Sequence, residues 1–211
     1  TNFSYSLWNQ DPKLIQKALD NEMSMLKNMG VNAIRVYTGI LQRWITYIYE
    51  NYGIYTMLNH SFGRYGVTID GAWMANTEYA NPKVRKLLLG EVEQMVEDYK
   101  DTPGLLLFLL GNENNYGLFW DGAETEDIPI EDRKSTIRAR DMYKLFNDAA
   151  NVMKAVDTDH PIAIANGDVL FLDIIAEEVP DIDIFGANVY RGATFTDLYD
   201  VVKREYGKPV L

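Results

Sequence analysis

Two patterns of apolar residues alternate along the chain. In the first, apolar residues recur every three or four positions, which predicts amphipathic helices. These helices are expected at about 11–29, 41–51 and 81–99, around 142–153, and at 170–179 and 196–206. In the second, short apolar runs have no polar alternation, which predicts buried strands at 32–37, 53–60, 105–110, 161–166, 183–190 and 208–211. The segment 61–78 shows neither pattern and is expected to be a long loop.

The regular alternation of strands and helices predicts an α/β fold with a parallel sheet. We see no linker or change of composition, so 1–211 is taken as one domain. An open doubly wound sheet would need a glycine-rich phosphate turn after its first strand, and none is present. A (β/α)8 TIM barrel is favoured, because its sites lie where strands end. Polar residues gather at such ends, namely Arg35, Tyr37, His60, Glu113, Asn166, Asn188 and Tyr190.

Composition excludes several classes of function. With 47% hydrophobic residues the chain can form a large core, and it holds no apolar run of about 18 residues for a membrane span. A net charge of -11 argues against nucleic acid and anionic membranes as partners. The absence of Cys removes disulfides and thiol nucleophiles, but does not decide localisation. An exported protein, periplasmic or extracellular, is the preferred expectation.

The segment "LLLFLLGNENN" places a carboxylate, Glu113, directly after a buried strand. If the strand stayed regular, Leu107, Leu109, Gly111 and Glu113 would share one side. The Asn112–Glu113 pair then stands at the top of the barrel interior, where a general acid could act. Only two His residues are present and they are far apart, so we expect neither a metal site nor a cofactor.

Four segments resemble the clan A glycoside hydrolases, a (β/α)8 superfamily. "LLLFLLGNE" resembles their fourth strand, and "MLKNMGVNAIRVY" resembles their first helix and second strand. "IFGANVY" is similar to their sixth strand, and "YGKPVL" is similar to the start of their seventh. The chain starts with Thr1 and ends in what looks like a beginning strand, so we expect an incomplete barrel, from the end of strand 1 to the start of strand 7. Family 2 glycosidases and family 72 β-1,3-glucanosyltransferases both fit.

The resemblance implies roles for individual residues. Glu113 would be the catalytic acid/base, and Asn112 would bind the 2-hydroxyl group of the sugar. Arg35 and Tyr190 would position the nucleophile. Tyr37, His60, Asn188 and Trp120 complete the predicted substrate-binding set, with Trp120 as a flat platform for a sugar ring.

The resulting prediction is a retaining hydrolase of β-glycosidic bonds in oligo- or polysaccharides. Such enzymes use two carboxylates about 5–5.5 Å apart. Asp168 and Glu205 are poor substitutes for the second carboxylate, since one follows another strand and the other lies on a helix. The resemblance implies that the nucleophilic Glu follows Leu211. A β-glucan transglycosylase and a non-catalytic carbohydrate-binding barrel remain the alternatives, and the sequence does not identify the sugar.

Overall fold

The computed structural model describes residues 7–119 and 128–211, and a five-stranded parallel sheet is its central feature. Its strands lie in chain order: β1 (Ala33–Tyr37), β2 (Tyr55–His60), β5 (Leu105–Leu110), β6 (Ile162–Gly167) and β7 (Ile184–Asn188). The predicted last strand also pairs, through a parallel bridge between Phe185 and Val210. Within the described residues β1 and β7 are the two ends of the sheet, so the sheet does not close into a barrel.

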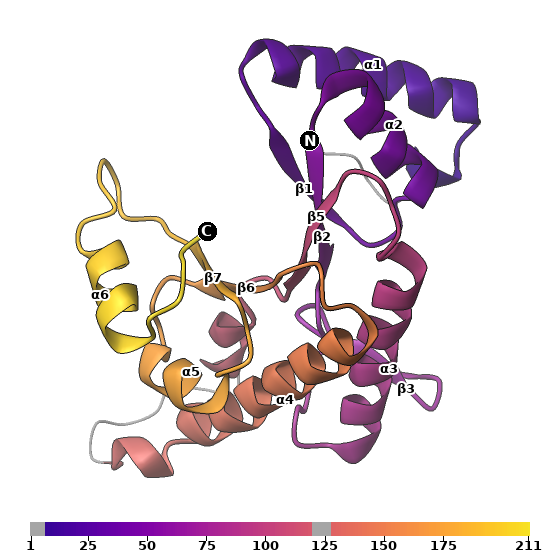
Figure 1. Ribbon diagram of the computed structural model, residues 1–211. Helices are drawn as coiled ribbons and strands as arrows, with labels where there is room; N and C mark the ends of the chain where they lie inside the picture. The colour runs from indigo at the N-terminus through magenta and orange to yellow at the C-terminus, as the bar shows by residue number, and fades with distance from the viewer. Residues whose placement is uncertain (1–6, 120–127) are drawn as a thin grey trace.

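Helices follow the strands around the outside of the curved sheet, as Figure 1 shows. They are α1 (Pro12–Asn28), α2 (Gln42–Tyr52), α3 (Pro82–Tyr99), α4 (Lys134–Val156), α5 (Leu172–Glu178) and α6 (Leu198–Glu205). The short 3-10 helices are η1 (Leu7–Asn9), η2 (Asn114–Phe119) and η3 (Ile130–Asp132). Asp11 and Asn81 cap α1 and α3, because each side chain accepts a hydrogen bond from the backbone N–H two residues on. In the described part of the chain no helix has the length and apolar character of a membrane span.

The expected loop at 61–78 is wrong for six residues. Strands β3 (Val67–Ile69) and β4 (Ala72–Met74) form a short antiparallel hairpin there. Asp70 and Gly71 connect them with φ of 51° and 81°, as a two-residue hairpin turn requires. Three-residue strands are too short for a visible alternation, although the Asp-Gly pair was itself a turn signal.

The two faces of the sheet are buried unequally. Even-numbered residues of the first four strands, such as Val36, Leu58 and Phe108, join the large core under all six α-helices, and in β7 Phe185 does so at an odd position. The other face carries a small inner cluster of Leu107, Leu109, Ala163 and Ala165, with Met57 and Ile184 at its edge. Because the helices share one face, the doubly wound alternative does not fit this fold.

Gly186 allows β7 to approach β6 closely. A Cβ atom there would lie 2.3 Å from the carbonyl oxygen of Ile164, a backbone atom that moves only with its strand. We expect Gly186→Ala to lower the free energy of unfolding by about 1–3 kcal/mol, measured as a lower urea midpoint. Gly90→Ala is the matched control, since nothing lies within 4 Å of the added methyl in α3. It should raise stability by about 0.5–1 kcal/mol, and an equal loss in both variants would contradict this packing.

Candidate active site

Side chains from β1, from the turn after β5 and from the end of β7 meet at the carboxyl edge of the sheet. Glu113 Oε1 accepts a hydrogen bond from the Tyr190 hydroxyl at 2.8 Å and another from Asn188 Nδ2 at 3.1 Å. Residues 75 and 77 positions apart in the chain therefore converge on one half-buried carboxylate. Its partners are polar donors rather than the apolar neighbours of a continued strand.

Glu113 is aimed by a left-handed turn, so the expected regular alternation after Leu109 is wrong here. β5 ends at Leu110, and Gly111 and Glu113 then have φ of 78° and 58°. The Glu113 N–H donates to the Ala165 carbonyl at 2.8 Å, which attaches the turn to β6. A left-handed conformation costs a residue with a side chain roughly 1–2 kcal/mol. Such a cost is common where the surrounding structure holds a functional group in place.

Asn112 connects the two sides of the site. Its Oδ1 accepts from Arg35 Nη2 at 2.9 Å and from Asn188 Nδ2 at 3.2 Å. Its Nδ2 donates to the Tyr65 hydroxyl at 2.8 Å. Because its Oδ1 accepts two hydrogen bonds and its Nδ2 donates one, the side chain has a fixed orientation next to Glu113.

Arg35 lies across the base of this cluster and also contacts Tyr37. Its guanidinium carbon is 5.4 Å from the centre of the Tyr37 ring, and Nη2 lies 3.4 Å from the Tyr37 hydroxyl. Nε donates to Asn59 Oδ1 at 2.5 Å, and Nη2 reaches the Gly111 carbonyl at 3.3 Å. The arginine thus joins β1, β2 and the turn that carries Glu113.

Sequence reasoning missed the residues that support the site from below. Asn59 is fully buried and donates to the carbonyls of Leu109 and Gly111, each at 3.0 Å. Asn59 is paired with Tyr37 on the neighbouring strand, and side-chain alternation along β2 could have placed it on the same face as Tyr37. Arg64 Nε donates to the Asn112 carbonyl at 2.9 Å, and nothing in the sequence pattern indicated that contact.

The two asparagines after Glu113 fix the turn. Asn114 Oδ1 accepts from the Asn112 N–H at 2.7 Å, and its Nδ2 donates to the Phe62 carbonyl at 2.8 Å. Asn115 exchanges two hydrogen bonds with the backbone of Gly167, both at 2.9 Å. Both side chains are buried. In the segment "NENN", the three asparagine amides therefore hold the turn that carries the Glu113 carboxylate.

His60 lies outside this cluster. Its Nδ1 accepts from the Phe62 N–H at 3.2 Å, and its Nε2 is 3.3 Å from Glu91 on α3. The ring therefore faces the helices rather than the inner side of the sheet. His160 pairs with Asp157, 2.7 Å away, just before β6. Trp120, the predicted sugar platform, lies outside the described residues.

The hydroxyl of Tyr190 is held as a donor. Its hydrogen bond to Glu113 raises the pKa of Tyr190, because ionisation would place two negative charges together. Burial raises the pKa of Tyr116, and the charges of Glu113 and Asp168 add to that effect. Within 7–119 and 128–211, no three His, Cys, Asp or Glu side chains are grouped to hold a metal ion.

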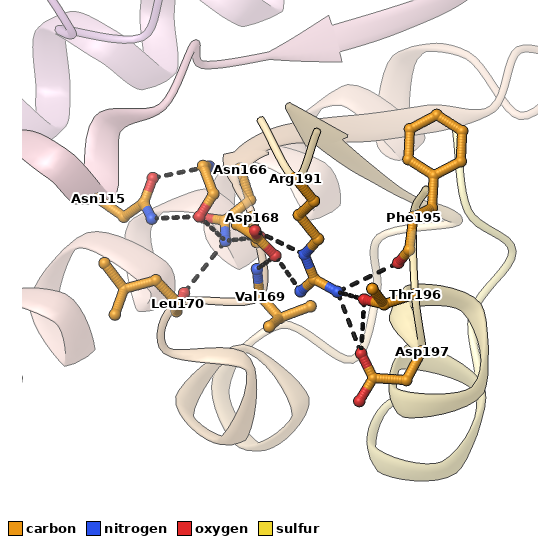
Figure 2. Close-up of polar contacts among 10 residues, drawn as sticks. Asn115, Asn166, Asp168, Val169, Leu170, Arg191, Phe195, Thr196 and Asp197 are labelled. Atoms are coloured by element: carbon orange, nitrogen blue, oxygen red, sulfur yellow. Dashed lines mark hydrogen bonds and ion pairs between the residues drawn. The ribbon is translucent and has the colours of Figure 1, made fainter. Parts of the chain in front are cut away.

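A second polar cluster adjoins the site beyond the end of β6. Arg191 binds both carboxylate oxygens of Asp168, through Nη2 and through Nε at 2.8 Å (Figure 2). Asp168 also accepts from the N–H of Val169 at 2.8 Å. These donors, Arg191 first, lower the pKa of Asp168 below its ordinary value of 3.8.

A lowered pKa makes this contribution to stability dependent on pH. It is complete above the unfolded-state pKa of Asp168 and is lost as the pH falls through the lower folded-state value. We expect Asp168→Asn to be less stable than wild type at pH 7, with the difference shrinking as the pH falls below 3.8 and through the lowered pKa of Asp168. Urea unfolding from pH 2 to 7 measures it, and a constant difference would contradict the ion pair.

Comparison with solved structures shows a fold that occurs in glycoside hydrolases. The chain is similar to Bacteroides uniformis β-glucuronidase 2 covalently bound to cyclophellitol-6-carboxylate aziridine, at 15% identity and TM-score 0.67, covering 95% of this chain and 23% of that one. It is similar to a β-galactosidase from Bacillus circulans, at 16% identity and TM-score 0.58, with 90% and 40% covered. A β-mannanase from the blue mussel Mytilus edulis matches at 11% identity and TM-score 0.67, with 100% and 74% covered.

These similarities establish the fold. The chain spans about a fifth of the length of the β-glucuronidases that it matches. No protein-family model matches the sequence, and no curated protein matches it either. These comparisons therefore define the fold of this chain and no family.

Proposed function

We propose that this protein is a retaining glycoside hydrolase that cleaves β-glycosidic bonds, built on part of a (β/α)8 barrel. One observation supports it above all: Glu113 stands at the carboxyl edge of the central strand, held by Tyr190 and Asn188 and flanked by the Arg35–Asn112 pair. A carboxyl group in a fixed position, flanked by hydrogen-bonding groups suited to sugar hydroxyls, is what acid/base catalysis at a glycosidic oxygen requires.

In the proposed mechanism Glu113 acts twice. It first donates its proton to the leaving oxygen while the nucleophilic carboxylate attacks the anomeric carbon, and the glycosidic bond breaks. It then takes a proton from water, which attacks the same carbon and releases the carboxylate. With a sugar hydroxyl in place of water, the same step transfers the glycosyl group, which is the transglycosylase alternative.

We propose that the nucleophile follows Leu211 in the full protein. The last residues of the chain run parallel to β7, since Val210 forms a parallel bridge with Phe185. The Leu211 N–H donates to the Phe185 carbonyl at 2.9 Å. Continuation of that strand leads to the edge at which Glu113 lies. Asp168 is unsuited to the role, because Arg191 binds both of its carboxylate oxygens.

The proposed substrate is a carbohydrate with a β-linkage. The similar structures are named for glucuronide, galactoside and mannan hydrolysis, so they share the β-linkage and differ in the sugar. Asn112 would bind the 2-hydroxyl group, with Tyr37 and Asn188 beside it. The exposed Tyr65, which holds the Asn112 amide, would line the same sugar.

The experiment is a turnover assay of the full-length protein on 4-nitrophenyl β-glycosides of glucose, galactose, mannose and glucuronic acid. NMR of the first sugar released from the best substrate then gives its anomeric form. We expect the β-anomer to appear first. Initial release of the α-anomer would contradict retention, and binding without turnover on any substrate would favour a non-catalytic barrel.

A further inference from the structure

Tyr190 needs an external support to keep its hydroxyl on Glu113. Its side chain is 80% exposed, so packing does not hold it. It lies in the segment between β7 and α6, residues 189–197, which has no helix or strand. An exposed tyrosine on such a segment samples several rotamers unless the backbone beside it is fixed.

The next residue, Arg191, supplies fixed contacts on two sides. Its Nη1 reaches Thr196 Oγ1 at 2.9 Å, Asp197 Oδ1 at 3.1 Å and the Phe195 carbonyl at 3.3 Å. Its Nε and Nη2 bind Asp168. Figure 2 shows the guanidinium between the end of β6 and the turn before α6. Five acceptor atoms surround a group with five N–H donors, so this cation is committed to the protein rather than to an anionic sugar.

Asp168, the other half of the pair, is itself well anchored. Its N–H donates to the Asn188 carbonyl at 3.0 Å, which ties it to β7. Its carbonyl accepts from Asn166 Nδ2 at 2.9 Å, and Asn166 Oδ1 accepts from Tyr143 at 2.6 Å. Tyr143 belongs to α4 and is 1% exposed, in the core. The pair therefore connects the segment that carries Tyr190 to the core of the fold.

We propose that the Arg191–Asp168 ion pair is a positioning device that holds the Tyr190 hydroxyl on the Glu113 carboxylate. Arg191 acts through its neighbour and does not touch the substrate. The catalytic consequence rests on the proposed function, but the contact between Tyr190 and Glu113 can be measured without any activity.

The direct test places 3-fluorotyrosine at position 190 of the full-length protein and follows its ¹⁹F NMR signal against pH. Glu113 raises the pKa of Tyr190, while Tyr116 and Arg35 are the other groups that act on it. Glu113→Gln gives the size of the shift that depends on the carboxylate. We expect Arg191→Ala and Asp168→Asn to lower the titration midpoint by at least half of that shift. Arg191→Lys, which keeps the charge opposite Asp168, should give an intermediate value.

Arg140→Ala is the matched control, because it removes an ion pair with Glu177 and Glu178 between α4 and α5. It should leave the midpoint unchanged. A wild-type midpoint in Arg191→Ala, or no shift in Glu113→Gln, would overturn the proposal. If Arg191→Ala or Asp168→Asn fails to fold, Arg191→Lys decides: an unshifted midpoint overturns the proposal, and a lowered one supports it.

Activity separates this proposal from the proposed function. If the protein is a glycosidase, Arg191→Ala should lower kcat by about ten- to a hundredfold with little change in KM, since misplacement affects the transition state most. A lowered midpoint in a protein without turnover would support the positioning device and contradict the proposed function. An unchanged midpoint with lowered kcat would overturn the device and leave the glycosidase standing.

Discussion

Glu113→Gln is expected to lower kcat/KM of the full-length protein on 4-nitrophenyl β-glycosides by about 10²–10⁴-fold, the usual contribution of a general acid or base. Gln keeps the acceptor atom that Tyr190 and Asn188 contact, so the turn should keep its shape. The loss should shrink on 2,4-dinitrophenyl glycosides, because that leaving group departs without a proton. Initial rates on the two substrates measure this dependence.

The control for this variant is Glu97→Gln. Glu97 lies on α3, pairs with Lys100 three residues on and is half exposed. Its replacement should leave turnover on both substrates at the wild-type value. Equal losses on both substrates in Glu113→Gln would contradict a role in protonating the leaving group, and full activity would remove Glu113 from the mechanism.

Arg35→Ala is expected to have the second-largest effect, on both activity and stability. The substitution removes donors from Asn59 Oδ1, from the Gly111 carbonyl and from Asn112 Oδ1. Asn59 Oδ1 then loses its donor, whereas the Gly111 carbonyl still accepts from Asn59 Nδ2 and Asn112 Oδ1 still accepts from Asn188 Nδ2. A buried acceptor without a donor costs about 1–3 kcal/mol, so we expect a loss of that size in the free energy of unfolding. Freed from Arg35, Asn112 should also misplace the sugar, lowering kcat/KM by about 10²-fold.

Arg35→Lys separates the two effects. A lysine amine restores the charge but cannot reproduce the planar geometry that reaches β2 and the turn together. It should recover part of the stability and little of the activity. Arg204→Ala is the matched control, since Arg204 is exposed on α6 and pairs with its neighbour Glu205. Urea unfolding measures the stability of these variants, and kinetics on the same samples measure their activity. A wild-type kcat/KM in Arg35→Ala would contradict the place of Arg35 in the site.

The position of most site residues could be predicted because parallel strands end at a common edge. That rule was enough to bring Arg35, Asn112, Asn188 and Tyr190 around Glu113, and the structure places them there. The alternation of side chains between the two faces of a strand would have made the prediction of the site residues more accurate. His60 has the parity of Leu58, which faces the helices, so its position on that side could be read from the sequence.

Other features depend on tertiary contacts that a single sequence does not display. The left-handed turn at Glu113 is held by the Ala165 carbonyl and by Asn114, which come from other parts of the fold. The hairpin at 67–74 is too short for a periodic signal. Nothing in the sequence distinguishes Asn59 from other polar residues. Its role as a support is visible only in its burial and in its contact with Arg35.

The measurement that tests the central claim most directly is azide capture by Glu113→Ala of the full-length protein. With 2,4-dinitrophenyl β-glycoside as substrate, the glycosyl-enzyme should form without the acid and then persist for lack of the base. Azide fits the space left by the side chain and needs no base, so turnover should rise with azide concentration and yield the β-glycosyl azide. Absence of both the rate increase and the azide product, in a folded variant that has lost activity, would contradict Glu113 as the acid/base of a retaining glycosidase.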